Sequence, residues 1–225
     1  MILALETSSS LCAACILDET TGAVLGEVSN DIGRGHAERL MDDIGEVLKL
    51  AGVGYSHLTS IATGVGPGSF TGIRVGVAAA RGFGLALKVP VLGITSLQAI
   101  AWQAREWADA SNIIVALDAG RDEIYMQTFD HDALPLGESL ALSLPHFLAS
   151  LTIGRSFVCG SAIALLNDQT LPQGISLHLP AIIPTATSVA FASTQPTMTV
   201  PPKPLYLRAP DAKTQPGFAI PGISL

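Results

Sequence analysis

The stretch GVGPGSFTGIRVG (residues 64–76) carries five glycines and one proline between an apolar run at 61–65 and a helix-like run at 75–87. Glycine-rich backbone can turn where a Cβ atom would clash, and it can present bare N–H groups at the start of a helix. The stretch therefore predicts a strand, a tight loop and a helix. The loop either binds an anion or only makes a close turn, and its spacing favours neither interpretation.

The predicted helix has a small residue at every fourth position, namely Gly72, Gly76, Ala80 and Gly84. Residues four apart lie on one side of an α-helix. Each glycine inside a helix costs roughly 1 kcal/mol relative to alanine. We therefore expect this side to pack very closely against another element. The stripe fits packing inside one domain, and it also fits a helix shared with another subunit.

Composition and charge restrict the class of protein. Of the 225 residues, 48% are hydrophobic and 14% are charged, which predicts a substantial core. The net charge of −7 and the scattered basic residues argue against unaided binding of nucleic acid. The start of the chain lacks a basic leader, and no apolar run is long enough to span a bilayer. We therefore expect a cytoplasmic protein that does not associate with membranes.

Cys12 and Cys15 form a C-x-x-C pattern, which is found in redox and zinc sites. Both lie in a predicted strand at residues 11–17, where residues three apart point to opposite faces. Only Cys159 remains besides them, so a site with four thiolates is excluded. The three cysteines are predicted to be core residues.

The order of predicted elements indicates an α/β fold of two related lobes. Three strands come first, and helices then alternate with strands; the expected ranges are 2–5, 11–17, 24–29, 37–50, 61–66, 74–87, 89–94 and 96–108. A strand, an acidic residue in a turn and a second strand recur at 113–129. Short elements are expected at 145–151, 157–159 and 162–167. This is the order of ribonuclease-H-like lobes, two of which make the actin-like architecture.

We expect the first lobe at residues 1–109. A smaller and degenerate second lobe is expected at 110–195. A proline-rich extended tail is expected at 196–225.

Six segments resemble a known family. They are ALETSS (4–9), HAERL (36–40), GPGSFTGIRVG (66–76), GITSL (93–97), LDAGR (117–121) with Tyr125, and PLYLR (204–208). In this order they are similar to the TsaB (YeaZ) family, which is related to the TsaD (Kae1, Gcp-like) proteins once called glycoproteases. The resemblance implies an actin-like (ASKHA) fold and a role in making threonylcarbamoyladenosine beside the anticodon of tRNAs. It further implies a partner that binds and supports a catalytic TsaD-like subunit, with a TsaE-like ATPase as third component.

The resemblance also bears on catalysis. The catalytic relatives carry a His-x-x-x-His pair that binds a metal, and the matching positions here are Ser96 and Ile100, neither of which can ligate through an imidazole. His36 has Leu40 at its i+4 position and therefore no ligand mate on its helix. We expect no metal, no intrinsic cofactor and no independent transferase activity. Glu6 replaces the commoner aspartate of the family, and its carboxylate lies one methylene further out.

The expected sites follow from the same resemblance. Weak ATP or ADP binding, in the cleft or at a subunit interface, is expected to use Glu6, Thr7, Ser8, Gly66, Gly68 and Asp118. The carboxylates could instead only cap turns, which we favour slightly. The partner interface is expected on the helices at 37–50 and 74–87, through Leu40, Ile44, Val47, Gly72, Gly76, Ala80, Phe83 and Gly84. Alone, the chain is expected to form a homodimer through this face, and tRNA is expected to bind only to the complex.

Two other functions remain open. The first is an actin-like ATPase or kinase that acts on its own and uses Glu6, Asp118 and the glycine loop. The second is a glycoprotease-like peptidase, which the older family label suggests. The segment 68–72 is not a G-x-S-x-G nucleophile elbow, because its serine directly follows the glycine.

Overall fold

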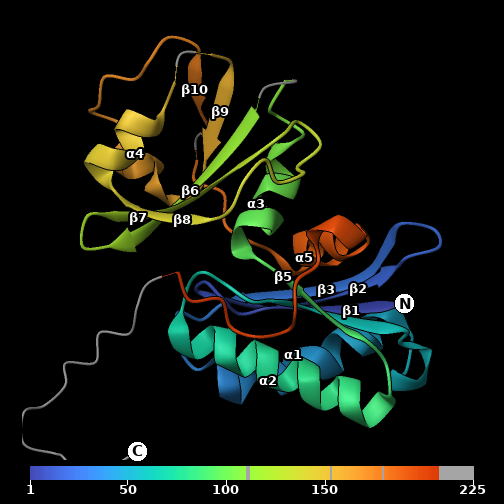
Figure 1. The fold of residues 1–225 in the computed structure, drawn as a ribbon. Coiled ribbons are helices and arrows are strands. Elements are labelled where there is room, and N and C mark those ends of the chain that lie inside the picture. Colours follow the sequence, from blue (N-terminus) through green and yellow to red (C-terminus); the bar gives the residue numbers. More distant parts are fainter. Residues whose placement is uncertain (110–111, 153, 179, 208–225) are drawn as a thin grey trace, which may run out of the picture.

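The computed structural model describes residues 1–109, 112–152, 154–178 and 180–207, so the end of the expected tail, 208–225, lies outside the described residues. The chain forms two lobes, each built on a five-stranded mixed sheet (Figure 1). The first sheet contains β1 (Ile2–Glu6), β2 (Leu11–Asp18), β3 (Ala23–Asp31), β4 (Ser60–Gly64) and β5 (Val91–Ile94). The second contains β6 (Asn112–Gly120), β7 (Glu123–Phe129), β8 (Leu140–Ser143), β9 (Ser156–Cys159) and β10 (Ile175–Leu177).

The two sheets have the same topology. Their strand orders are β3-β2-β1-β4-β5 and β8-β7-β6-β9-β10. In each sheet the first strand pairs antiparallel with the second strand and parallel with the fourth. The third strand is antiparallel to the second, and the fifth is parallel to the fourth. This repetition confirms the two related lobes of an actin-like fold.

Helices cover both faces of the first sheet. They are α1 (His36–Ala51), α2 (Phe70–Leu87) and α5 (Ala186–Ser193), while α3 (Ser96–Ala104) and α4 (Leu144–Ser150) pack on the second sheet. Figure 1 shows α1 and α2 side by side beneath the first sheet, with α3 and α5 between the two lobes. Leu40, Ile44 and Val47 of α1 belong to the apolar cluster that joins α1 and α2 to the sheet. A second cluster fills the space around α3 and α5.

Helix α5 places the lobe boundary differently from the expectation. The range 110–195 assigns this helix to the second lobe, but α5 packs on β1, β2 and β4 of the first sheet. The chain after it stays with the first lobe, because Val200 pairs with Gly93 and the Leu205 N–H donates to the Val65 carbonyl oxygen at 2.8 Å. The apolar sequence of residues 186–193 fits this burial between two lobes.

The second lobe also differs in detail. Strands β8 and β10 were not expected, and the short helix expected at 162–167 is a 3-10 helix at Ser161–Leu165. Both strands are short and lie at the two edges of their sheet. Short strands give a weak sequence signal, although the four-residue strands β5 and β9 were expected.

Helix α2 has 18 residues with a mean hydropathy of 1.2, so by length and composition alone it could cross a membrane. This corrects the expectation that no apolar run is long enough. One third of the helix is buried in the protein, on the side that faces the first sheet. Packing on the sheet accounts for the apolar residues on that side of the helix.

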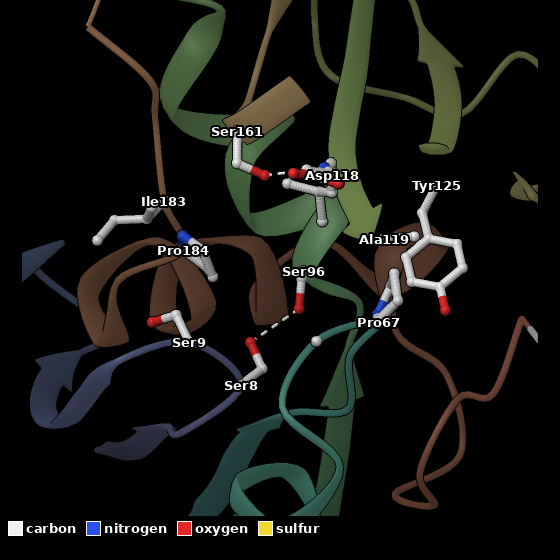
Figure 2. Close-up of a pocket in the computed structure, with 12 residues that line it drawn as sticks. Ser8, Ser9, Pro67, Ser96, Asp118, Ala119, Tyr125, Ser161, Ile183 and Pro184 are labelled. Carbon is white, nitrogen blue, oxygen red and sulfur yellow. Dashed lines mark hydrogen bonds between the residues drawn. The ribbon is translucent and has the colours of Figure 1, made fainter. Parts of the chain in front are cut away.

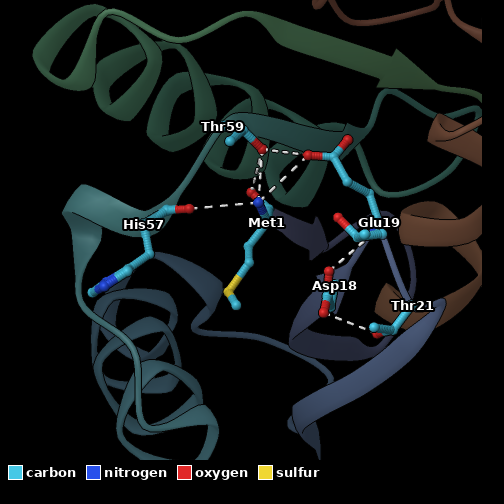
Figure 3. Close-up of polar contacts among 7 residues, drawn as sticks. Met1, Asp18, Glu19, Thr21, His57 and Thr59 are labelled. Atoms are coloured by element: carbon cyan, nitrogen blue, oxygen red, sulfur yellow. Dashed lines mark hydrogen bonds and ion pairs between the residues drawn. The ribbon is translucent and has the colours of Figure 1, made fainter.

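A polar cluster fixes the start of the chain (Figure 3). The amino group of Met1 donates to Thr59 Oγ1 at 2.8 Å, and it lies 3.5 Å from Glu19 Oε1. Thr59 Oγ1 in turn donates to Glu19 Oε1 at 2.7 Å. The cluster ties the turn between β2 and β3 to the start of β4.

Candidate functional site

The glycine loop joins β4 to α2 and lies against the segment that follows β1. Ser69 caps α2 by accepting a hydrogen bond from the Gly72 N–H at 3.2 Å. The Ser69 N–H donates to the Ser8 carbonyl oxygen at 2.7 Å, and Pro67 has no N–H to offer. Some backbone N–H groups of the loop that could bind an anion are thus already bonded within the protein, and Pro67 lacks one.

The glycines of this loop and helix permit very close backbone contacts. A Cβ atom on Gly68 would overlap the Ser8 carbonyl oxygen, and one on Gly72 would overlap the Thr7 carbonyl oxygen. A Cβ atom on Gly76 would overlap the Thr7 side chain. Of the two interpretations of the glycine loop, the structure supports close packing.

This packing corrects the expected partner interface. The stripe of small residues faces the first sheet, because Gly84 lies against Val91 of β5 and Ala80 is fully buried. Leu40, Ile44 and Val47 are at most 1% exposed. Phe83 is half-buried and stacks on Tyr55, with ring centroids 5.5 Å apart.

The outward surface of the two helices is made by other residues. Met41 of α1 is 54% exposed, and Phe70 and Leu85 of α2 are 55% and 83% exposed. Arg74 and Arg81 also lie on the exposed side of α2. We call these five residues the outer helix face.

Glu6 ends β1 and is fully buried. Its Oε1 accepts hydrogen bonds from the backbone N–H and the hydroxyl of Ser8, whereas Oε2 has no partner among the described residues. Burial raises the pKa of Glu6 to about 7, although hydrogen bonds from Ser8 and Thr7 partly oppose this rise. Oε2 is packed against Gly64, where a Cβ atom could not fit. The carboxyl group is therefore a core group that supports the Ser8 loop.

A cleft of about 400 Å³ lies between the lobes (Figure 2). Its lining residues are Ser8, Ser9, Pro67, Gly68, Ser96, Leu117, Asp118, Ala119, Tyr125, Ser161, Ile183 and Pro184. The hydroxyl oxygens of Ser8 and Ser96 are 2.9 Å apart and form a hydrogen bond. The Asp118 N–H donates to Ser161 Oγ at 3.0 Å, while Asp118 Oδ1 accepts from the Gly120 N–H at 2.7 Å. The Asp118 carboxylate thus caps its own turn.

The structure divides the expected nucleotide residues into two groups. Ser8, Gly68 and Asp118 line the cleft, whereas Glu6, Thr7 and Gly66 are not among its lining residues. Glu6 and Thr7 are fully buried, and Thr7 donates to the Gly72 carbonyl oxygen at 2.8 Å.

Some residues of the cleft were not expected from the sequence. Ser9 and Ser161 were not among the expected site residues, and Ser96 was considered only as a metal position. Ser96 and Ser161 follow the parallel strands β5 and β9. Ligand sites in such sheets lie at the carboxyl ends of the strands, so this position could have identified both residues.

Ser96 and Ile100 are 1% and 0% exposed on α3. Within the described ranges, no three side chains of His, Cys, Asp or Glu gather as metal ligands. We predict that the purified protein carries no stoichiometric zinc or iron, which elemental analysis after purification without chelators measures. One equivalent of zinc or iron bound by side chains of this chain would contradict the prediction.

The fold and the cleft define a two-lobed protein of the actin-like class. A family model described as "TsaD: tRNA N6-adenosine threonylcarbamoyltransferase" matches residues 20–149. The TsaB protein of Haemophilus influenzae is 36% identical over 124 residues, which cover 55% of this chain and 51% of that protein. The chain thus spans about half the length of that relative. An uncharacterized protein of Mycobacterium tuberculosis is 32% identical over 216 residues, 94% of this chain and 93% of that protein.

The structure named YeaZ from Pseudomonas aeruginosa superposes with a TM-score of 0.76 at 28% identity. The superposition covers 92% of this chain and 99% of that one. The chain belongs to the TsaB (YeaZ) family.

Proposed function

We propose that this protein is a non-catalytic partner subunit in the biosynthesis of threonylcarbamoyladenosine in tRNA. It binds a TsaD-like catalytic subunit in the cytoplasm. The observation that carries the proposal is the start of α3, where Ser96 and Ile100 occupy the positions of a metal-binding histidine pair. Ser96 bonds to Ser8 and Ile100 is packed in the core, and neither side chain offers an imidazole ligand.

The names of the relatives support the pathway. The proteins from Haemophilus influenzae, Escherichia coli and Bacillus subtilis are each called a tRNA threonylcarbamoyladenosine biosynthesis protein TsaB. The net charge of −7 supports a role in which tRNA is contacted only through the complex.

The outer helix face supports a protein partner. It exposes three large apolar side chains on two adjacent helices, flanked by two arginines, and such a patch is typical of an interaction site. We assign this face to the TsaD-like subunit. In the absence of that subunit the same face pairs with a second copy of the chain, because an isologous contact buries the outer helix face of both copies. A TsaE-like ATPase is the third component.

The substitution Leu85→Arg tests the interface. Leu85 is 83% exposed, so the change should leave the fold intact while placing a charge where the partner would bury an apolar side chain. We expect co-purification with the TsaD-like subunit to fall at least about tenfold. Leu136→Arg is the control, because Leu136 is also exposed, at 57%, but lies in the second lobe. The interface would lie elsewhere if both variants lost binding equally, or if neither variant lost binding.

The function itself is tested by reconstitution. Modification of tRNA is measured with the complete set of components and with each one left out. We expect product only when this chain and the TsaD-like subunit are both present. The alternative is an autonomous ATPase that uses the cleft between the lobes, and steady ATP turnover by the purified chain alone would favour it over the proposal.

A further inference from the structure

The proposed partner role does not use the cleft between the lobes. Its lining nevertheless combines hydroxyl groups with apolar side chains. Its polar side chains include the hydroxyl groups of Ser8, Ser9, Ser96 and Ser161 and the carboxylate of Asp118, which come from four separate segments of the chain. Apolar surface faces them, contributed by Pro67, Leu117, Ile183 and Pro184. Figure 2 shows the ring of Tyr125 beside Pro67 and Ala119.

The charge of this lining does not suit phosphate groups. No lysine, arginine or histidine lines the cleft in the described part of the chain, while the carboxylate of Asp118 does. Phosphates are ordinarily held by basic side chains, free backbone N–H groups or a metal ion. A like charge such as that of Asp118 repels them.

Three backbone donors near the cleft are also engaged. The Ser69 N–H donates to the Ser8 carbonyl oxygen. At the start of α3, the Ser96 N–H donates to the Gly66 carbonyl oxygen at 2.8 Å, and the Gln98 N–H donates to Thr95 Oγ1 at 3.0 Å. Glu6 is fully buried behind the lining residue Ser8, to which its Oε1 is bonded, so it does not offer a carboxylate to a metal-bound phosphate in the cleft.

We propose that this cleft binds an uncharged ring compound with several hydroxyl groups, of the chemistry of a nucleoside, and discriminates against nucleoside polyphosphates. The ring packs on Tyr125 and Pro67, and the hydroxyl groups of the ligand bond to Ser9 and Ser161, which are only half-buried. The cleft volume of about 400 Å³ falls in the range usual for small-molecule sites. This ligand class is independent of the partner role, and the two are tested separately.

Calorimetric titration of the full chain with adenosine, ADP and ATP, each with and without Mg²⁺, tests the proposal. We expect adenosine to bind, and ADP and ATP to bind at least about tenfold more weakly, because their charges meet Asp118 without a basic partner. We expect Mg²⁺ not to reverse this order. Binding of ADP or ATP as tight as that of adenosine, or no binding of adenosine at millimolar concentration, would overturn the proposal.

Two variants locate the site. Asp118→Asn keeps an oxygen that can accept from the Gly120 N–H, and it should narrow the difference between adenosine and ADP by removing the charge. Tyr125→Leu should weaken adenosine binding about tenfold through loss of the ring contact. Tyr55→Leu is the control, since Tyr55 lies outside the cleft lining. Circular dichroism confirms that each variant is folded. Unchanged adenosine binding by Tyr125→Leu would overturn the assignment.

Discussion

Replacement of Glu6 by glutamine is expected to remove a fall of about 2 to 3 kcal/mol in the free energy of unfolding that the native chain shows between pH 5 and pH 8. Burial raises the pKa of Glu6 from its ordinary 4.5 to about 7 in the folded protein, and the unfolded chain keeps the ordinary value. Between these two values the folded state holds more protons, so a rise in pH destabilises it. The stability linked to this proton is fully present below pH 4.5 and is lost as the pH rises through 7.

The measurement is urea unfolding at several pH values from 5 to 8. Glutamine keeps the acceptor oxygen that Ser8 uses but cannot ionise, so the curve of Glu6→Gln should be flatter than that of the native chain. Glu138→Gln is the control, because Glu138 is exposed. Its replacement should leave the change of the free energy of unfolding with pH the same as in the native chain. Parallel curves for the native chain and Glu6→Gln would show that Glu6 stays ionised in the fold.

Gly72→Ala is expected to lower the free energy of unfolding by about 3 kcal/mol or more, although it adds a single methyl group. The new Cβ atom would overlap the carbonyl oxygen of Thr7. Thr7 cannot easily move away, because it follows the buried strand β1 and its hydroxyl is bonded to the Gly72 carbonyl oxygen. Helix α2 must therefore shift away from the sheet.

Gly82→Ala is the matched control in the same helix. Nothing lies within 4 Å of a Cβ atom at Gly82, and the residue is exposed. This change should raise the stability by about 0.5 to 1 kcal/mol, since alanine favours the helix. The two substitutions are thus predicted to have opposite signs ten residues apart. A small effect of both would mean that α2 is not held against the Thr7 loop.

The order of elements could be predicted from the sequence because it depends on local patterns. The helical spacing of apolar residues marked α1, and the glycine-rich run marked the loop before α2. The repeated sequence of a strand, an acidic residue in a turn and a strand indicated the second lobe. The short edge strands β8 and β10 were missed, because a strand of three or four residues gives only a weak local pattern.

The path of the chain after the second lobe was decided by tertiary contacts. Helix α5 carries the apolar sequence of a buried element, but that sequence does not say which lobe buries it. Only the contacts of α5 with β1 and β2 show that the chain returns to the first lobe. Such contacts join residues more than 150 positions apart, and a local pattern holds no information on them.

The sequence by itself determined that this is a two-lobed α/β protein with a glycine-rich loop between a strand and a helix at residues 64–76. It also determined that Ser96 and Ile100 cannot form a histidine pair. Tertiary structure alone decided that the stripe of small residues faces the sheet and not a partner. The reason is that glycine permits a close approach from any direction, and the atoms that approach Gly72 and Gly76 belong to Thr7, a residue that only folding brings near. Burial of Glu6, and with it the raised pKa, likewise exists only once the lobe is assembled.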